Sequence, residues 1–392
     1  MDSPWTLDPG IDFLNHGSYG ACPRAVLEEQ TALRARMERQ PVQFFRDLEE
    51  PLDEARAFLG AFVGADPDDL AFVHNATTGV NTVVRSLEFS PGDELLTTDH
   101  AYNACRNALR WHEKSGVKVV LTRVPWPILG PWQVIEAILG AVTARTRLVL
   151  LDHVTSPTGL VFPVAELVRR LAERGIDTMI DGAHAPGMIP LDLRAIGAAY
   201  YTGNCHKWLC APKGSAFLHV RRDKQGLIKP IALGHGLNST RTDRSAFRLQ
   251  TDWVGTDDPT GYLCVPAAIR FLGSLLPGGW AELMERNHAL ALRGRALLCS
   301  ALRVEAPAPE FMLGSLAAVP LPDYAGEPPP TTSAWWHPLQ KQLLQTHRIE
   351  VPVMVFPASP RQLIRISAQL YNSEEQFARL AAALMLSFGS HG

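Results

Sequence analysis

Residues 200–220 read YYTGNCHKWLCAPKGSAFLHV, two apolar runs on either side of a segment that contains Lys207. Both runs are typical of buried strands, whereas a lysine normally keeps its ammonium group in water because burying an unpaired charge is costly. Burial lowers the pKa of a lysine and favours the neutral amine. The stretch therefore predicts two strands whose connection presents Lys207 as a buried nucleophile. Lys213, in the turn APKGS, is expected in solvent.

Similar apolar runs precede this stretch and alternate with amphipathic segments. Helices are expected at 23–40, 53–64, 103–114 and 164–175. Strands are expected in the runs LAFVHN, DELLTT, VKVVLTRV, RLVLLDHV, DTMIDGAH, AAYYTGN and SAFLHV, all within about residues 65–220. Short apolar strands separated by helices predict an α/β fold with a mainly parallel sheet.

The rest of the chain predicts a second, smaller α/β unit. A looser stretch at about 223–258 is followed by two long helical runs, GYLCVPAAIRFLGSLL and WAELMERNHALALRGRALLCSAL. The tail is expected to contain strands near 314–320, 349–353 and 363–367, a helix near 336–346, a final helix from Ser373, and a Pro-rich surface loop at 320–333. We expect three parts: an N-terminal segment at the active-site entrance (1–22), a large domain (23–260) and a small C-terminal domain (261–392).

Composition excludes several classes of protein. The chain has 392 residues, 46% of them hydrophobic and 20% charged, with a net charge of −3, so neither nucleic acid nor an anionic membrane is an expected partner. No apolar run approaches the ~20 residues that span a bilayer. The N-terminal sequence MDSPWTLDPGIDF lacks the features of a secretory signal, so a cytoplasmic location is expected. The six cysteines are scattered, which predicts reduced thiols and no metal site.

Polar residues follow four of the predicted strands. They lie at Ala76–Thr78, at Asp99, His100 and Tyr102, at Thr155 and Ser156, and at Asp181 and His184. Ligands of open α/β sheets bind beyond the carboxyl ends of the strands. We therefore expect these groups to share one crevice with Lys207.

Pyridoxal phosphate chemistry requires this combination of groups. A lysine amine forms a Schiff base with the aldehyde, and a carboxylate keeps the pyridine nitrogen protonated, a role that suits Asp181. The phosphate requires backbone N–H groups at a helix start, which NATTG provides if the helix begins at Thr77 or Thr78.

At these residues the chain resembles a known family. The motifs DGAH, TGNCHKW and APKGSAFLHV are similar to those of class V aminotransferase-fold enzymes. The motifs FLNHGSYGACP, HNATTGVN, TDHAYNA, GTDDPT, IEVPV and LIRISAQLYNSEEQ resemble the isopenicillin N epimerase-like branch, to which ergothioneine-pathway C–S lyases also belong. The resemblance runs from about Phe13 to Phe377. It implies a pyridoxal-phosphate-dependent transferase fold of type I, aspartate aminotransferase-like.

The resemblance assigns roles around the cofactor by position. Lys207 would form the Schiff base, Asp181 would hold the pyridinium nitrogen, and His184 would lie near the ring's phenolic oxygen. Either His100 or Tyr102 would stack on the ring, and the sequence does not decide between them. Further contacts would come from Ser156 to the ring oxygen and from Ala76, Thr77, Thr78, Asn204 and His206 to the phosphate.

The resemblance also implies a homodimer and an amino-acid substrate. Thr256, in GTDD, would reach the phosphate bound by the partner subunit. Arg365, in IRIS, would bind the substrate α-carboxylate with two hydrogen bonds. Asn15 and His16 would line the substrate entrance. A structural role is favoured for the Asp152–His153 pair because no third metal ligand has suitable spacing.

Several reactions remain open. No cysteine follows Cys299, so formation of a persulfide on the enzyme, as in cysteine desulfurases, is disfavoured. An amino-acid epimerase and a C–S lyase that eliminates a β-substituent both fit, and an aminotransferase or a non-catalytic, cofactor-binding regulator fits less well. A dinucleotide dehydrogenase lacks its Gly-rich fingerprint here.

Overall fold

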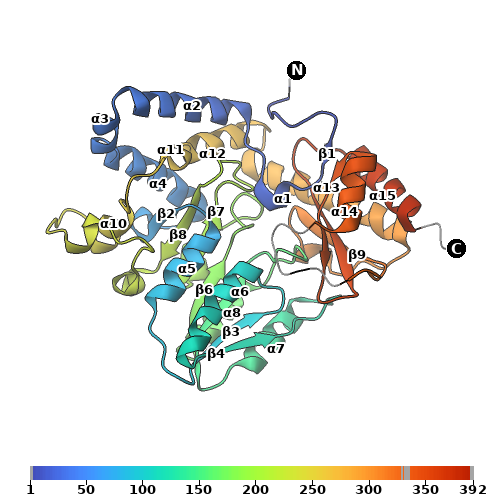
Figure 1. Ribbon diagram of the computed structural model, residues 1–392, viewed down its shortest axis with the longest axis horizontal. Coiled ribbons are helices and arrows are strands. Elements are labelled where there is room, and N and C mark those ends of the chain that lie inside the picture. Colours follow the sequence, from blue (N-terminus) through green and yellow to red (C-terminus); the bar gives the residue numbers. More distant parts are fainter. Residues whose placement is uncertain (1–2, 328–329, 331–335, 389–392) are drawn as a thin grey trace.

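A seven-stranded sheet forms the centre of the larger part of the molecule (Figure 1). The computed structural model describes residues 3–327, 330 and 336–388. The strands, in spatial order, are β2 (Leu70–Val73), β8 (Ala216–Val220), β7 (Tyr200–Asn204), β6 (Asp177–Asp181), β5 (Thr146–Asp152), β3 (Glu94–Thr98) and β4 (Lys118–Thr122). All of them fall in the predicted runs. Only β8 is antiparallel to its neighbours, so the predicted α/β fold with a mainly parallel sheet is confirmed.

Helices cover both faces of this sheet. On one face α5 (Ala76–Ser86) contacts β7 and β8, and α6 (Asn103–Arg110) contacts α5. On the other face lie α7 (Pro131–Ala141), α8 (Val164–Ala172) and α9 (Leu193–Ile196). Burial on both faces explains why β5, β6 and β7 read as continuous apolar runs.

A helical layer lies beside β2 (Figure 1). It contains α2 (Arg24–Arg39), α3 (Pro41–Arg46), α4 (Glu49–Val63), α10 (Ala246–Thr251), α11 (Thr260–Leu263) and α12 (Val265–Ser274). The single helix expected in GYLCVPAAIRFLGSLL is thus two helices, with Pro266 in the first turn of the second. The sequence prediction missed α7, α10 and the short helices α1 (His16–Tyr19), α3 and α9. Short 3-10 helices are η1 (Pro67–Asp69), η2 (Trp111–Ser115), η3 (Arg222–Leu227), η4 (His235–Asn238) and η5 (Glu310–Met312).

The C-terminal part has its own three-stranded antiparallel sheet, ordered β11-β12-β9. The strands are β9 (Leu316–Leu321), β11 (Val353–Val355) and β12 (Gln362–Ser367), and the helices are α13 (Gly279–Leu302), α14 (Pro338–His347) and α15 (Glu374–Phe388). The N-terminal segment joins this part, because β1 (Asp12–Phe13) pairs in parallel with β10 (Ile349–Glu350) and continues into α1 (His16–Tyr19). The predicted loop at 320–333 begins inside β9, and its residues 328–329 and 331–333 lie outside the described ranges.

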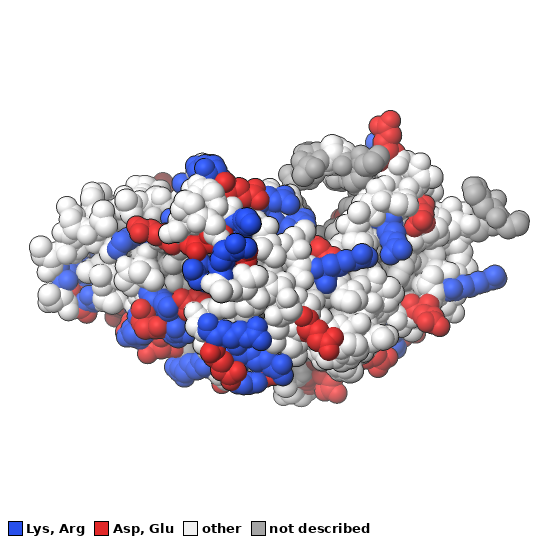
Figure 2. Space-filling view, turned by 90° about the horizontal axis from the view of Figure 1, so that it is seen from below, with Lys and Arg blue, Asp and Glu red and all other residues white. Residues whose placement is uncertain are grey.

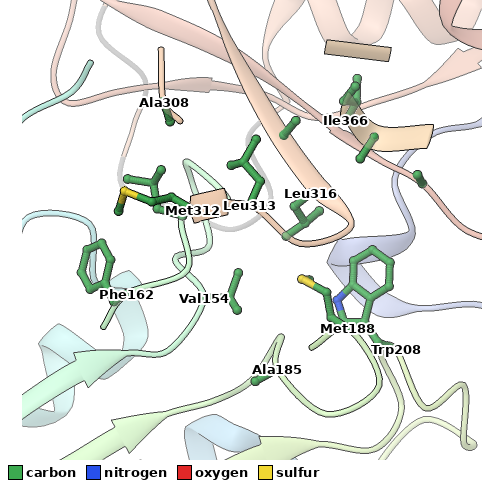
Figure 3. Packing of buried hydrophobic residues seen from close by; sticks show 14 of the residues in the cluster. Val154, Phe162, Ala185, Met188, Trp208, Ala308, Met312, Leu313, Leu316 and Ile366 are labelled. Atoms are coloured by element: carbon green, nitrogen blue, oxygen red, sulfur yellow. The ribbon is translucent and has the colours of Figure 1, made fainter. Parts of the chain in front are cut away.

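One hydrophobic cluster joins the two parts (Figure 3). Met312, Leu313 and Leu316 face side chains that follow strands of the large sheet, among them Val154, Met188 and Trp208. Continuous burial of this kind holds β12 against the ends of the large sheet. The divisions at 22/23 and 260/261 stay predictions.

No single helix within the described ranges is both long and apolar enough to cross a bilayer; Thr260–Ser274 and Gly279–Leu302 meet the two conditions only together, as a pair bent by 72°.

Candidate active site

A cavity of about 680 Å³ lies where β5, β6 and β7 end and where α1 and β12 approach the large sheet. It contains eleven of the residues singled out in the sequence: Ala76, Thr77, Thr78, Tyr102, Ser156, Asp181, His184, Asn204, His206, Lys207 and Arg365. Its lining also includes Gly17, Ser18, Tyr19, Asp152 and Lys213.

Lys207 follows β7 in a tight loop, and its side chain reaches into the cavity. Its Nζ lies 3.1 Å from Nε2 of His184, whose Nδ1 faces the indole N–H of Trp208 at 3.5 Å. Burial, and after it the charge of Arg365, lowers the pKa of Lys207 to about 7, while Asp181 opposes the shift. Lys207 can therefore supply a neutral amine near neutral pH.

Asp181 ends β6 at the floor of the cavity. One carboxylate oxygen accepts the backbone N–H of Ala183 at 3.0 Å, and the other accepts the thiol of the fully buried Cys105 at 3.1 Å. Asp152 lies opposite Asp181 in the β5–β6 register, and its Oδ2 has no hydrogen-bond partner within the described residues. Burial, and after it the charge of Asp181, raises the pKa of Asp152 well above its usual range. Asp152 therefore favours its protonated form, which is the form that burial beside a second carboxyl group stabilises.

The first turn of α5 forms one end of the cavity. The helix begins at Ala76, one residue before the predicted start. The side chain of Asn75 accepts the N–H of Thr78 at 2.9 Å, and that of Asn204 accepts the N–H of Ala76 at 2.8 Å. His206, beside it, donates from Nδ1 to the carbonyl of Ser215 at 2.9 Å, which leaves Nε2 for a ligand. A helix N-terminus with threonine hydroxyls suits an anion such as phosphate.

Arg365, on β12, lies at the end of the cavity opposite to α5. Only 3% of this residue is exposed, and burial lowers its pKa to about 10. Nη1 donates to the Ser156 carbonyl at 2.5 Å and to its hydroxyl at 3.3 Å, and Nη2 donates to the Ser18 hydroxyl at 3.1 Å. Nε has no partner, and among the described residues Arg365 forms no ion pair with a carboxylate. A buried guanidinium held only by uncharged oxygens is a site for an anionic ligand.

The structure separates the two candidates for a stacking group. Tyr102 lines the cavity and is 49% exposed. His100 is fully buried outside the cavity lining, where Nδ1 bonds to the Thr158 hydroxyl at 2.8 Å and Nε2 to the Val124 carbonyl at 3.2 Å. The expectation that His100 could face a bound ring is corrected, because its ring is buried against Phe162 and Phe356, outside the cavity lining.

The N-terminal segment approaches the cavity through residues that the sequence analysis did not single out. Ser18 and Tyr19 line the cavity, whereas Asn15 and His16 are buried beside it, so their expected place at the entrance is corrected. His16 bonds to the Lys207 carbonyl at 3.1 Å and to the Tyr371 hydroxyl at 2.7 Å. The missed residues follow the named pair after Gly17, in HGSYG, and both belong to α1, from which Ser18 contacts Arg365.

Gly20 allows this close approach. Its φ is +72°, and a Cβ placed there would lie 2.3 Å from the carbonyl oxygen of His206. Only glycine fits this contact between the N-terminal segment and the Lys207 loop.

The remaining predicted residue, Thr256, lies on an exposed loop and does not line this chain's own cavity. All six cysteines are free and buried, and none lines the cavity. In the described part of the chain, no group of three His, Cys, Asp or Glu side chains is arranged to hold a metal ion.

The residues present fit pyridoxal phosphate. A neutral lysine amine suits the aldehyde, the Asp181 carboxyl group at the cavity floor suits the pyridinium nitrogen, and the start of α5 suits the phosphate. Arg365 remains for a second anion, such as a substrate carboxylate.

Comparison with known sequences agrees with this geometry. A sequence model described as aminotransferase class V matches residues 21–380. Isopenicillin N epimerase of Amycolatopsis lactamdurans is 37% identical to this chain over 397 residues, which cover 97% of this chain and 96% of the relative. A probable L-cysteine desulfhydrase of Arabidopsis thaliana chloroplasts is 30% identical, over 96% of this chain and 83% of the relative.

Solved structures show the same fold. A lysine-to-alanine mutant of C-DES, with glycine covalently linked to its pyridoxal phosphate cofactor, superposes with a TM-score of 0.77 at 22% identity and covers 96% of each chain. A cysteine desulfurase of Thermococcus onnurineus NA1 gives a TM-score of 0.77 at 18% identity and covers 97% of this chain and 95% of that chain. At these identities the structures show the fold alone. The match of the family model and the identity of the relatives confirm the resemblance seen in the sequence: the chain belongs to the class V aminotransferase family.

Proposed function

We propose that this chain is a pyridoxal-phosphate enzyme that acts at Cα of an amino-acid substrate and inverts its configuration, as an isopenicillin N epimerase-like enzyme. The observation that carries the proposal is one cavity that contains both an amine with a pKa of about 7 and a buried guanidinium that has no acidic partner among the described residues. An α-amino acid has the two groups that such a cavity would bind, because its amine suits the Lys207 end and its carboxylate suits Arg365.

In this proposal each part of the cofactor would bind to side chains or backbone groups that line the cavity. When bound, pyridoxal phosphate supplies an aldehyde for the amine and a ring that withdraws electrons from the substrate Cα. Asp181 would hold the proton of the pyridine nitrogen, supported by the Cys105 thiol. Tyr102 would contact the ring face, and His184 and Ser156 would contact the ring oxygen. The phosphate would lie against Ala76, Thr77, Thr78, Asn204 and His206.

Two side chains would move protons in an epimerisation. Lys207 Nζ, neutral near pH 7, can accept the proton of the substrate Cα. Inversion requires a donor on the opposite side of that carbon, and we assign this role to Tyr102 Oη. Burial raises the pKa of Tyr102, so its phenol keeps a proton to deliver.

A second candidate function is β-elimination at a C–S bond. Four plant relatives that bear the name L-cysteine desulfhydrase are 28–30% identical to this chain over 96% of its length. The same proton acceptor would serve, and Tyr102 would protonate the departing sulfur instead of Cα. No cysteine lines the cavity, so the proposal includes no sulfur carrier on the chain.

We also propose that two copies of the chain form the working enzyme. Thr256 does not line its own cavity, so a phosphate contact from this residue requires a partner subunit. Apolar side chains on the nearby loops are exposed, with Leu233 at 59% and Ile231 at 51%. Figure 2 shows few charged residues at the left end of the molecule, the end that carries α10 in Figure 1. A second copy would cover this apolar surface. The cytoplasmic location stays a prediction.

A solvent-exchange experiment tests the proposed reaction. The purified protein and its Lys207→Ala variant are incubated in D₂O with isopenicillin N and, separately, with L-cysteine. We expect a visible cofactor band that borohydride fixes to Lys207, together with deuterium at Cα of an inverted product. Release of sulfide and pyruvate from L-cysteine without inversion of isopenicillin N would favour the second candidate. A protein that retains no cofactor, or a Lys207→Ala variant that still forms the borohydride-reduced adduct, would overturn the proposal.

A further inference from the structure

A chain of hydrogen bonds connects Arg365 to the N-terminal segment. Nη2 of Arg365 donates to the Ser18 hydroxyl at 3.1 Å, and that hydroxyl donates to Oδ1 of Asn15 at 2.5 Å. Asn15 donates from Nδ2 to the Glu350 carboxylate at 2.8 Å. We propose that Ser18 and Asn15 are positioning residues that hold the Arg365 guanidinium for a carboxylate ligand. This inference rests on the proposed function.

The direction of each hydrogen bond in this series is fixed. A carboxylate can only accept, so the amide nitrogen of Asn15 faces Glu350 and its carbonyl oxygen faces Ser18. The Ser18 proton is then committed to Asn15, and the lone pairs of its oxygen are left for Arg365. Ser18 therefore acts as an acceptor, and it orients the guanidinium without neutralising it.

This series of hydrogen bonds also keeps the Glu350 carboxylate away from Arg365. Glu350 is the last residue in the series of hydrogen bonds, and Asn15 and Ser18 lie between it and Arg365. A direct ion pair would satisfy the guanidinium and compete with an incoming carboxylate. With only uncharged oxygens as partners, Arg365 keeps its full charge for a ligand.

The helix that carries Ser18 is anchored to both ends of the cavity. The N–H of Gly17 donates to the hydroxyl of Ser367 on β12 at 3.0 Å, two residues beyond Arg365. His16 contacts the Lys207 carbonyl at 3.1 Å. These contacts place Ser18 relative to the carboxylate end and to the amine end together. An α-amino acid must meet both, so this fixed placement would favour a productive orientation.

Paired ligands that differ only in the carboxylate test the inference. The holoenzyme is titrated with L-alanine and ethylamine, and with L-norleucine and pentylamine, while the cofactor absorbance is followed. We expect Ser18→Ala to weaken the binding of both amino acids by roughly tenfold, which is the effect of one lost hydrogen bond to a charged group. The affinity for both amines should stay within twofold of that of the native enzyme. Ser18→Thr keeps the hydroxyl and should restore binding of the amino acids.

Two further variants guard against a trivial result. Asn15→Ala removes the acceptor of the Ser18 proton and should weaken the binding of the amino acids more than that of the amines. This variant tests the inference independently if Ser18→Ala folds poorly. Ser115→Ala removes an exposed hydroxyl that bonds only to a local carbonyl, and it serves as the matched control. The melting temperature of every variant is measured beside the native enzyme.

The outcomes separate this inference from the proposed function. An equal loss of affinity for amines and for amino acids would overturn the positioning role, and so would unchanged affinity in both Ser18→Ala and Asn15→Ala. A native holoenzyme that binds amino acids no better than amines would also overturn it. Absence of a borohydride-reducible cofactor band in the native protein would instead refute the proposed function.

Discussion

At the scale of single residues, the cavity is built from groups whose ordinary charge states are changed by burial. Burial shifts Lys207 toward its neutral form and Asp152 toward its protonated form, and Arg365 keeps a charge that no carboxylate of the described chain balances. These shifts come from desolvation and from neighbouring charges, and both are set by tertiary contacts. Each pKa shift can therefore be tested by changing the pH, or by a substitution that keeps the shape of the side chain.

Attachment of the cofactor should follow the pKa of Lys207. Only the neutral amine reacts with an aldehyde, so the rate should rise with pH through about 7 and then level off. At pH 6 the rate should be roughly one tenth of its plateau, whereas an ordinary lysine would still gain about tenfold per pH unit between 7 and 9. The measurement is the growth of the visible band after pyridoxal phosphate is added to cofactor-free protein, with N-acetyl-lysine as control. A rate that still climbs at pH 9 would contradict the assigned shift.

The two carboxyl groups at the cavity floor should respond differently to the same change. Asp152→Asn replaces a protonated acid with a neutral group of similar shape, so retention of the cofactor and its band between pH 6 and 8 should change little. Asp181→Asn removes the carboxylate proposed to hold the pyridinium nitrogen, and turnover should fall by roughly 10²-fold or more because the pyridinium proton loses its partner. Both variants should keep the melting temperature within a few degrees. Similar losses in the two would show that Asp152 is ionised.

At the scale of elements, the site depends on how closely α5 lies against the large sheet. Gly79 in α5 faces Thr202 on β7, and a Cβ at this position would lie 2.3 Å from Thr202 Oγ1. Thr202 cannot turn away freely, because its hydroxyl donates to the Phe217 carbonyl at 2.7 Å. The same helix carries the first turn that would hold the phosphate, so its distance from β7 affects both stability and binding.

Gly79→Ala should therefore destabilise the protein even though alanine is the better helix former. Overpacking costs about 1–3 kcal/mol, and the gain in helix propensity offsets about 1 kcal/mol of it. The phosphate end should also loosen, so cofactor retention should fall in parallel with the free energy of unfolding, measured in urea.

Gly140 in α7 offers the matched control. A Cβ there meets nothing within 4 Å, so Gly140→Ala should raise the free energy of unfolding and leave the cofactor in place. A Gly79→Ala variant as stable as Gly140→Ala would show that α5 can shift without cost.

At the scale of the whole molecule, the apolar end near α10 would need a partner. Introducing charge there with Leu233→Glu should convert the proposed dimer into monomers, because burying an unpaired carboxylate in an interface is costly. Light scattering after gel filtration measures the mass, and cofactor retention should fall with it. Leu129→Glu, at a residue 75% exposed on another loop, is the control. Thr256→Ala should remain dimeric and lose cofactor affinity alone; a native monomer that retains cofactor would refute the shared site.

Much of this architecture could be predicted from the sequence because its causes are local. The strands read as short apolar runs, and for those inside the sheet, such as β5 and β6, the reason is burial on both faces, which favours apolar residues along the strand. Polar residues at the strand ends predicted the crevice, and a lysine in an apolar stretch predicted a side chain that lines it; the role of that lysine as nucleophile stays a proposal. Eleven of the predicted site residues line the cavity for this reason.

Other features were decided only by the tertiary structure. The choice of Tyr102 over His100 depends on which side of a loop each residue faces, and two residues in such a short span can face opposite ways. Asp152 meets Asp181 only through the register of β5 and β6, and Cys105 meets it only through the placement of α6. Ser18 reaches Arg365 across 347 residues of sequence. Periodicity along the chain reports which residues are buried, but contacts between distant segments depend on how whole elements pack together, and that is fixed only when the chain folds.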